Sequence, residues 1–159
     1  MKIKVNDTIP EINFFYISES GPKKISSKEL FAGKKVILVG VPGAFTPTCS
    51  LEHLPGFIEK KKEIYEKGIE KIIFVSKNDP FVMNEWKKSK SENDIIFIGD
   101  SMGEFAEKSG LKMDLSVIGL GERLSRFALI IEDNVIKNIF DEEGGGFEKS
   151  SANDVLKAL

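Results

Sequence analysis

The chain has 159 residues, of which 41% are hydrophobic and 30% are charged, and its formal net charge is −2 at pH 7. This length suits one domain with a sizeable core, and the charge excludes a global field that would attract nucleic acid or an anionic membrane. No apolar run reaches the roughly 20 residues that a spanning helix needs, and the first residues resemble neither a secretory nor a transit presequence. We therefore expect one cytoplasmic domain over residues 1–159, with no nucleic-acid or membrane partner.

The N-terminal half of the chain predicts strands and one long helix. Residues up to about 35 suggest a β-hairpin with its turn near Ser20-Gly21-Pro22. The uninterrupted apolar run at 34–41 is typical of a buried strand. Residues 50–67 carry apolar side chains at helical spacing, and Gly68 marks where we expect this helix to stop.

The C-terminal half continues the alternation of strands and helices. Pro80 is expected at the first position of a helix that Asn78 or Asp79 caps, and a turn is expected at Asp133-Asn134. In chain order, the pattern predicts a strand at 71–76, a helix from 80 to about 88, a strand at 95–100, a short helix at 102–109 ended by Gly110, two strands within 126–140 and a last helix that begins after Ser150 or Ser151.

This order of elements predicts an α/β fold of the thioredoxin-like kind. We expect a central mixed β-sheet flanked by helices, with an N-terminal β-hairpin extension. In such sheets ligands tend to bind at the carboxyl ends of the strands. The strand at 34–41 ends at Val41, where the stretch VPGAFTPTCS (41–50) begins.

The chain contains one cysteine and one histidine, and this limits its chemistry. A disulfide within the chain is impossible, and a zinc site of Cys and His ligands cannot be assembled, so we expect no metal and no cofactor. Cys49 lies at a predicted helix start, where free N–H groups and the helix dipole favour the reactive thiolate. These residues alone leave an inert buried thiol and a reactive nucleophile as equally supported alternatives.

The residues before Cys49 suggest a narrow, rigid pocket. Pro42 and Pro47 stiffen the loop and remove two N–H donors. Gly43 leaves room for a small substrate. Thr46 lies three residues before Cys49, so its hydroxyl can reach the thiolate or a ligand beside it.

A family resemblance strengthens the reactive interpretation. The stretch PGAFTPTC (42–49) matches the P-x-x-x-T-x-x-C motif of peroxiredoxins. Nearly the whole chain resembles the peroxiredoxin 5 subfamily, also called atypical or type II. The matching segments are HLPGF (53–57), VSKNDPFVMNEW (75–86), GDSMGEFAEKSGLKMDLS (99–116), GLGERLSRFALIIED (119–133) and GGGFEKSSANDVLKAL (144–159).

The resemblance implies a thiol-specific peroxidase that reduces hydrogen peroxide and organic hydroperoxides to water and alcohols. Cys49 would be the peroxidatic cysteine, whose thiolate attacks the peroxide and becomes a sulfenic acid. Arg126 maps onto the family's conserved arginine and would stabilise the thiolate and the breaking O–O bond. Thr46 would hold the peroxide, and Pro42 would shield the sulfur.

We expect Gly43, Phe45, Thr48 and His53 to line the substrate pocket. His53 follows Cys49 by four residues, so the two share a helix face. No recognisable third residue completes a protease-like Cys–His pair, so a supporting role in the pocket is expected. Phe45 is expected at the pocket rim or at a dimer contact.

Other notable residues are interpreted by their ordinary roles. Arg123, which competes with Arg126 for the family position, is expected at the surface or at an interface. Phe81 and Trp86 are expected in the core. Gly144–Gly146 does not fit a phosphate-binding loop, because no Lys-Ser/Thr directly follows the last glycine.

The single cysteine also decides how the cycle would end. Plant-type members of the subfamily carry a second, resolving cysteine at a position that aligns with Phe74, so the resemblance implies a 1-Cys form here. An external thiol would reduce the Cys49 sulfenic acid, and we favour glutathione with glutaredoxin over thioredoxin. A homodimer is expected, as in the subfamily. The alternative is a redox sensor or relay module that passes Cys49 oxidation to a partner protein.

Overall fold

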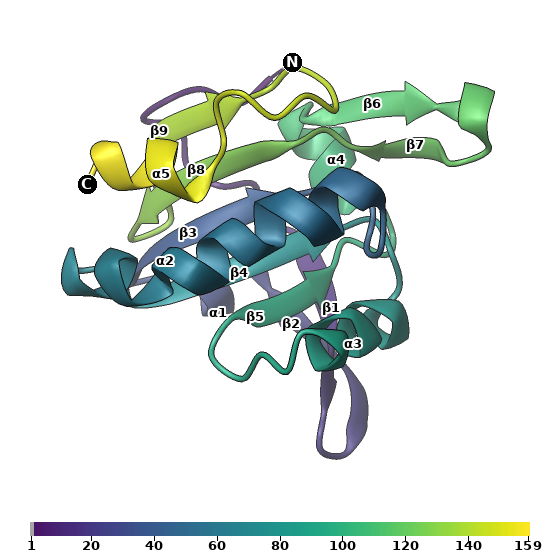
Figure 1. Ribbon diagram of the computed structural model, residues 1–159, viewed down its shortest axis with the longest axis horizontal. Helices are drawn as coiled ribbons and strands as arrows, with labels where there is room; N and C mark the ends of the chain where they lie inside the picture. The colour runs from purple at the N-terminus through teal and green to yellow at the C-terminus, as the bar shows by residue number, and fades with distance from the viewer. Residues whose placement is uncertain (1) are drawn as a thin grey trace.

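The computed structural model describes residues 2–159 and centres on a seven-stranded mixed sheet with helices on both faces (Figure 1). The strand order is β2-β1-β5-β4-β3-β8-β9. The three middle strands, β3 (Lys35–Gly40), β4 (Lys71–Ser76) and β5 (Ile96–Gly99), run parallel, and the other neighbours are antiparallel. The prediction of an α/β fold with a flanked mixed sheet is confirmed.

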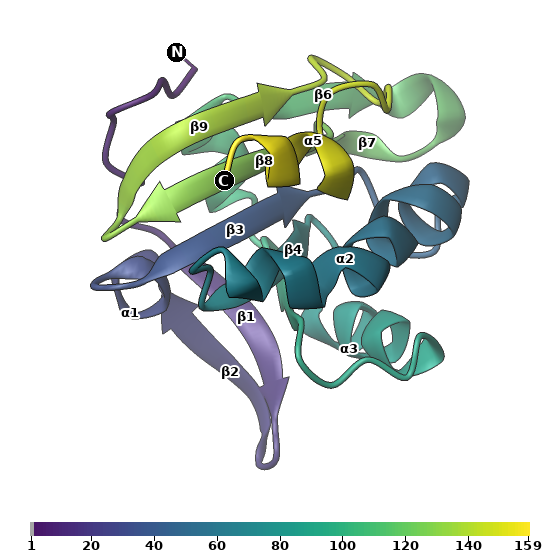
Figure 2. The same cartoon turned by 60° about the vertical axis from the view of Figure 1, so that its left-hand side comes forward.

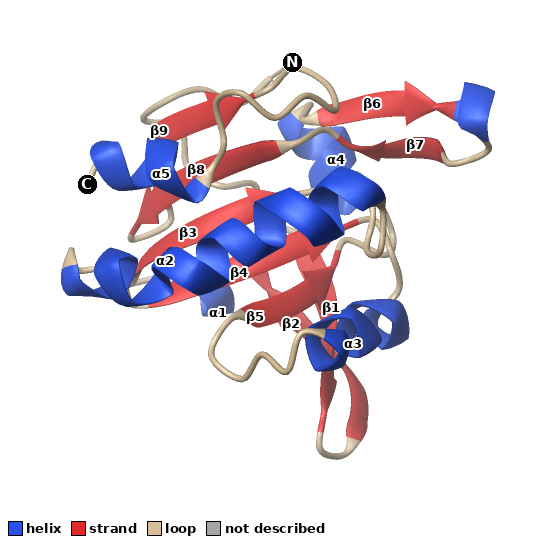
Figure 3. Cartoon of the chain, viewed as in Figure 1, coloured by secondary structure: helices blue, strands red, loops and turns tan. Residues whose placement is uncertain are grey.

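The remaining elements surround these three strands (Figure 3). The predicted N-terminal hairpin consists of β1 (Asn13–Ser18) and β2 (Gly21–Ser26), and β8 (Phe127–Glu132) and β9 (Val135–Asp141) form the opposite edge. A separate two-stranded sheet pairs β6 (Lys112–Leu115) with β7 (Gly121–Leu124). The helices are α1 (Ser27–Phe31), the π-helix η1 (Cys49–His53), α2 (Leu54–Glu66), α3 (Pro80–Ser89), α4 (Glu104–Ser109), the 3-10 helix η2 (Ser116–Ile118) and α5 (Ala152–Lys157).

Helices cover both faces of the sheet, so the core has two halves. Helices α2, α3 and α5 lie on one face, and α1 and α4 lie on the other (Figures 1 and 2). Strand β3 contributes to both halves, because successive side chains point to opposite faces. Val36 and Leu38 pack in the cluster that includes Phe105 of α4, whereas Ile37 packs with Phe57 of α2. In the part of the chain that the structure describes, no helix combines the length and apolar character needed to cross a membrane.

The predicted helix over 50–67 differs from the structure at its start. The amide of Leu54 donates to the carbonyl of Cys49, five residues earlier, which defines the π-helix η1 before α2 begins. Pro55 explains the change, since it has no N–H to donate to the carbonyl of Leu51 in a regular α-helical ladder. A π-turn of this kind is rare and often accompanies a functional site.

Two other regions of secondary structure were not predicted from the sequence. Helix α1 has only five residues, too few to show a helical period. Strands β6 and β7 are four residues each and mostly half-exposed, so they show no apolar alternation. Of the two proposed caps for α3, Asp79 is the one used, accepting from the amide of Val82 at 2.9 Å, and Ser151 caps α5.

The pairing of β3 with β8 places distant segments side by side. Strand β3 ends at Gly40, which pairs with Phe127 at the start of antiparallel β8. The loop after β3 therefore meets Arg126 at the same edge of the sheet. Gly40 has no Cβ, and this allows the close approach of the Phe127 ring, which a side chain at position 40 would contact.

Candidate active site

Cys49 is fully buried at the start of the helix that follows β3. The amide of Ser50 donates to the carbonyl of Thr46 at 2.9 Å, which is the first α-type bond of this helix. The amides of Thr48 and Cys49 come earlier in the turn and have no intrahelical acceptor. The helix start therefore offers N–H groups near the sulfur, and these favour an anion there.

Arg126 brings a cation to Cys49 from a distant part of the chain. It precedes β8, is only 2% exposed, and donates from Nη2 to the sulfur of Cys49 at 3.2 Å. Within residues 2–159, no carboxylate forms a salt bridge with its guanidinium. A buried cation without a counter-charge is unfavourable, and the group that this guanidinium contacts at Nη2 is the Cys49 sulfur.

His53 holds another edge of the same guanidinium. Its Nδ1 lies 2.9 Å from Nη1 of Arg126, and its Nε2 lies 2.9 Å from the carbonyl oxygen of Ser150. A guanidinium only donates and a carbonyl only accepts, so the ring is neutral and carries its proton on Nε2. Burial, and next the charge of Arg126, lower the pKa of His53 to about 3, against opposing effects of the Ser150 bond and Glu142.

His53 was expected to line or support the pocket, and the structure places its side chain in contact with Arg126. Its side chain is fully buried, and its ring packs against those of Phe57, Phe74 and Phe147. The helix face that His53 shares with Cys49 points into the core, where the side chain reaches Arg126. His53 therefore supports the guanidinium from behind.

The loop residues before Cys49 are tied to one another. The Thr46 hydroxyl donates to the carbonyl of Gly43 at 2.7 Å, and none of its hydrogen bonds within residues 2–159 involves the Cys49 sulfur. The oxygen keeps lone pairs that can accept from a bound ligand. Pro42 and Gly43 are buried, and a Cβ at Gly43 would lie 3.1 Å from Nη1 of Arg123 and 3.2 Å from the Thr46 methyl.

The sequence did not predict that two further residues, Arg123 and Asn78, support this loop. Arg123 was expected at the surface or at an interface, but its half-buried side chain donates to the carbonyls of Leu120 at 2.9 Å and Pro42 at 3.3 Å. Asn78, proposed as a helix cap, instead accepts the amide of Ala44 at 2.9 Å. Its position just after β4, at the carboxyl end of a parallel strand, was the available signal.

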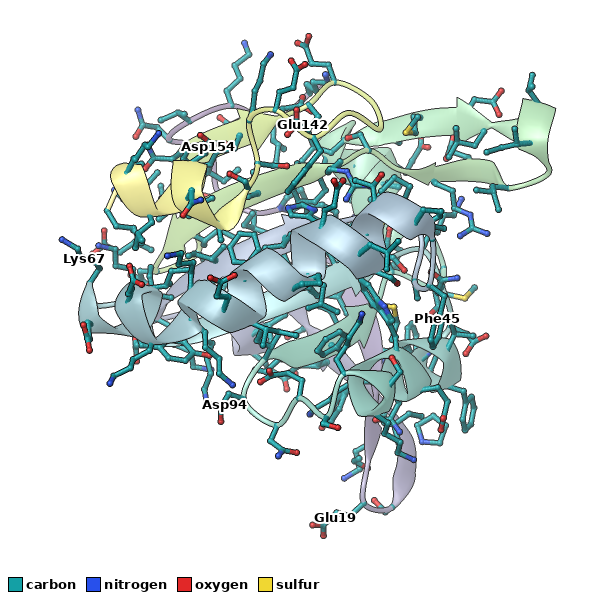
Figure 4. All side chains as sticks on the ribbon, viewed as in Figure 1. Glu19, Phe45, Lys67, Asp94, Glu142 and Asp154 are labelled. Carbon is teal, nitrogen blue, oxygen red and sulfur yellow. The ribbon has the colours of Figure 1, made fainter. Side chains whose placement is uncertain are left out.

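The aromatic residues divide between the core and the surface. Trp86 is fully buried, as predicted, and its indole N–H donates to the hydroxyl of Ser50 at 2.8 Å. The prediction that Phe81 lies in the core is wrong, since it is 61% exposed. Phe45 is 53% exposed in the turn after β3, in the left-handed region with φ of 64° (Figure 4). Thr48 is half-buried and makes no side-chain cap bond.

Comparison with known proteins gives consistent matches over nearly the whole chain. The Redoxin family model matches residues 4–156. Peroxiredoxin-2B from Arabidopsis thaliana is 48% identical over 159 residues, which cover 99% of this chain and 98% of the relative. The structure of reduced Prx3 from Vibrio vulnificus in complex with hydrogen peroxide superposes with a TM-score of 0.94 at 38% identity, covering 98% of each chain. The Plasmodium falciparum antioxidant protein, described as a 1-Cys peroxiredoxin, gives a TM-score of 0.92 at 31% identity, covering 99% of this chain and 98% of the other.

The environment of His53 predicts a specific dependence of stability on pH. The folded-state pKa of about 3 lies below the usual 6.5, so between these values the unfolded chain binds the extra proton. The stability that His53 contributes is therefore complete above about pH 6.5 and is lost as the pH falls toward 3. Wild type should lose about 1 kcal/mol per pH unit more than His53→Gln over this range.

Urea unfolding of both proteins between about pH 6.5 and pH 4 measures this difference. Asp100, whose pKa burial raises to about 6 despite bonds from Phe105 and Ala106, contributes the opposite slope in part of this range. Its effect is common to both proteins and cancels in the comparison. Parallel pH profiles would show that His53 is not held neutral by its surroundings.

Proposed function

The chain belongs to the Redoxin family and is a peroxiredoxin, and on this basis we propose that Cys49 is the peroxidatic cysteine of a thiol-dependent peroxidase. Its substrates are hydrogen peroxide and organic hydroperoxides, which it reduces to water and alcohols. The family and the peroxidase class predicted from the sequence are confirmed. We propose in addition the roles of individual residues, the recycling thiol and a homodimeric assembly.

The contact between Arg126 and Cys49 is the observation that supports the proposed roles of these two residues. The guanidinium of Arg126 is buried, lies 3.2 Å from the Cys49 sulfur and forms no salt bridge within residues 2–159. A sulfur held against an unpaired cation is suited to act as a thiolate nucleophile. The same cation can stabilise charge that develops on the departing peroxide oxygen.

In the oxidation step, the Cys49 thiolate attacks the terminal oxygen of the hydroperoxide. An S–O bond forms as the O–O bond breaks, and the electron pair leaves on the second oxygen. That oxygen takes up a proton and departs as water or alcohol, and the sulfur is left as a sulfenic acid. Arg126 and the free amides at the helix start donate to the peroxide oxygens. The hydroxyl oxygen of Thr46 accepts a hydrogen bond from the peroxide O–H, because its own hydrogen is donated to the carbonyl of Gly43.

We further propose that the sulfenic acid is reduced by an external thiol in a 1-Cys cycle. Cys49 is the only cysteine among the 159 residues, so no second thiol of this sequence can resolve it. A thiol attacks the sulfur and releases water, which leaves a mixed disulfide that a second thiol reduces. Because Cys49 is fully buried, the helix start must open for this attack, and glutathione needs a smaller opening than a protein thiol. This favours glutathione with glutaredoxin over thioredoxin.

A homodimer is supported by an apolar edge next to the site. Phe45, Phe81 and Met102 follow the carboxyl ends of β3, β4 and β5, so the parallel strands bring them to one edge of the sheet. All three are more than half exposed, which is typical of an interface. Sedimentation equilibrium should give a dimer for wild type and for the control Val5→Glu, and a monomer for Phe45→Glu/Phe81→Glu. A wild-type monomer at all concentrations would contradict the dimer.

Rapid mixing of the reduced protein with peroxide tests the assigned roles. Trp86 is the only tryptophan and bonds to Ser50 beside Cys49, so its fluorescence should report oxidation of the sulfur. Cys49→Ser should lose the fluorescence change. Arg126→Gln should slow oxidation by about 100- to 1,000-fold and Thr46→Val by at least about tenfold, because each removes a group that binds the transition state.

The fold of each variant is checked by circular dichroism. Peroxide consumption by Cys49→Ser at the wild-type rate would disprove the peroxidase assignment. Unchanged oxidation rates in folded Arg126→Gln or Thr46→Val would remove that residue from the mechanism.

Steady-state assays with three reductants test the recycling step. We expect sustained turnover with glutathione plus glutaredoxin, and mass spectrometry should find one glutathione on Cys49 when glutaredoxin is left out. Turnover with thioredoxin alone, without a glutathione adduct, would contradict the favoured reductant. A stall after one equivalent of peroxide with every thiol would instead favour the redox-sensor alternative.

A further inference from the structure

We propose that Glu142 is a positioning residue of the peroxidase site, which fixes Arg126 through Ser150 and His53 without touching substrate. This inference rests on the proposed role of Arg126 and extends it to a residue outside the family motif. Glu142 lies just after β9, under the loop that leads to α5, as labelled in Figure 4.

The carboxylate of Glu142 binds the loop that follows it. Its Oε2 accepts the amides of Glu148 at 3.0 Å, Lys149 at 2.7 Å and Ser150 at 2.7 Å, and also the Ser150 hydroxyl at 2.8 Å. Its Oε1 accepts the Glu148 amide at 3.0 Å. Burial raises the pKa of Glu142, but these hydrogen bonds outweigh it, so the pKa lies below its usual range. Glu142 is therefore an anion that gathers three successive amides onto one oxygen.

The fixed loop then presents a carbonyl to His53. Since Ser150 is buried and its amide is held by Glu142, its carbonyl is oriented toward Nε2 of His53 at 2.9 Å. This bond holds the ring with its Nδ1 lone pair toward Nη1 of Arg126. The opposite end of that guanidinium, Nη2, donates to Cys49. In each hydrogen bond from Glu142 to Cys49, only one of the two groups can be the donor, so the direction of every bond is fixed.

The loop also binds Arg126 directly. The backbone amide of Arg126 donates to the carbonyl of Gly144 at 2.8 Å, and its Nε donates to the carbonyl of Gly145 at 3.4 Å. The ring of Phe147 lies 5.9 Å from the guanidinium carbon. The loop that makes these contacts contains three successive glycines, Gly144–Gly146, which resist ordering because glycine has the largest backbone freedom. The hydrogen bonds from residues 148–150 to Glu142 order the C-terminal end of this loop.

The backbone adds a further link between the two residues. The amide of Glu142 donates to the carbonyl of Arg126 at 3.1 Å, so Glu142 is anchored directly beside the residue whose side chain it positions. Removing its carboxylate would release both the Ser150 carbonyl and the glycine loop. The guanidinium would then lose defined partners for Nη1 and Nε and would no longer be held against the sulfur.

Three substitutions of Glu142 test whether its effect on Cys49 oxidation depends on the length of the side chain or on its charge. Glu142→Ala removes all acceptors and should slow Cys49 oxidation by peroxide about 10- to 100-fold, the range expected when a reacting group is displaced by about 1 Å. Glu142→Gln keeps an amide oxygen at full reach and should stay within a few-fold of wild type. Glu142→Asp keeps the charge but shortens the side chain, and should be slower than Glu142→Gln. Glu132→Ala, an exposed residue at the far end of β8, is the control and should oxidise at the wild-type rate.

A double-mutant cycle with Arg126→Gln tests whether Glu142 affects the oxidation rate through Arg126. If Glu142 acts through Arg126, Glu142→Ala should change the oxidation rate by less than about twofold in the Arg126→Gln background. Urea unfolding of each variant runs alongside, and folded Glu142→Asp gives the same comparison should Glu142→Ala not fold.

Three results would overturn the proposal: unchanged rates in folded Glu142→Ala and Glu142→Asp, equal losses in both Arg126 backgrounds, or Glu142→Asp faster than Glu142→Gln. Unchanged rates would place Glu142 outside the site, and equal losses in both backgrounds would give it a general structural role. A faster Glu142→Asp would show that the charge of the side chain matters rather than its reach. Failure of the proposed function is a separate outcome, in which wild type and Arg126→Gln are oxidised at the same rate.

Discussion

The burial of one cation against one sulfur is the constraint on which the site depends. Arg126 is almost completely excluded from solvent, and its Nη2 donates to Cys49 rather than to a carboxylate. A carboxylate partner would already balance the charge of a buried guanidinium, whereas here the group in contact with Nη2 is the Cys49 sulfur. His53 must be neutral for the same reason, because a protonated ring would place a second cation beside the guanidinium of Arg126.

The fold builds this pair by bringing together the ends of adjacent strands. The antiparallel pairing of β3 and β8 sets Cys49 and Arg126 at one edge although 77 positions separate them in the chain. The π-turn at Cys49 follows from Pro55, which interrupts the helical ladder. Asn78 and Arg123 then hold the loop before Cys49, and Glu142 holds the loop behind Arg126. Rigid supports of this kind preorganise a site before substrate arrives.

The fold and a candidate nucleophile could be predicted from the sequence, whereas most of the residues that support the candidate site could not. Long apolar strands gave the mixed sheet, and the motif around Cys49 identified a candidate thiol. Arg126 came from family resemblance, because no local pattern reports an antiparallel contact. Glu142 gave no signal, since an acidic residue in a polar stretch is usually solvated and its partners are backbone amides. The spacing of His53 and Cys49 predicted that they share a helix face, but it could not predict that His53 contacts Arg126, because that contact depends on a segment 73 positions away.

The charge state of Cys49 in the reduced protein is the property that depends most directly on its contact with Arg126. The ultraviolet thiolate absorbance at neutral pH, taken as the difference between wild type and Cys49→Ser, isolates this one sulfur. We expect a clear thiolate band in wild type that is lost or strongly reduced in Arg126→Gln. A band that is absent from wild type, or that survives unchanged in the folded variant, would contradict it.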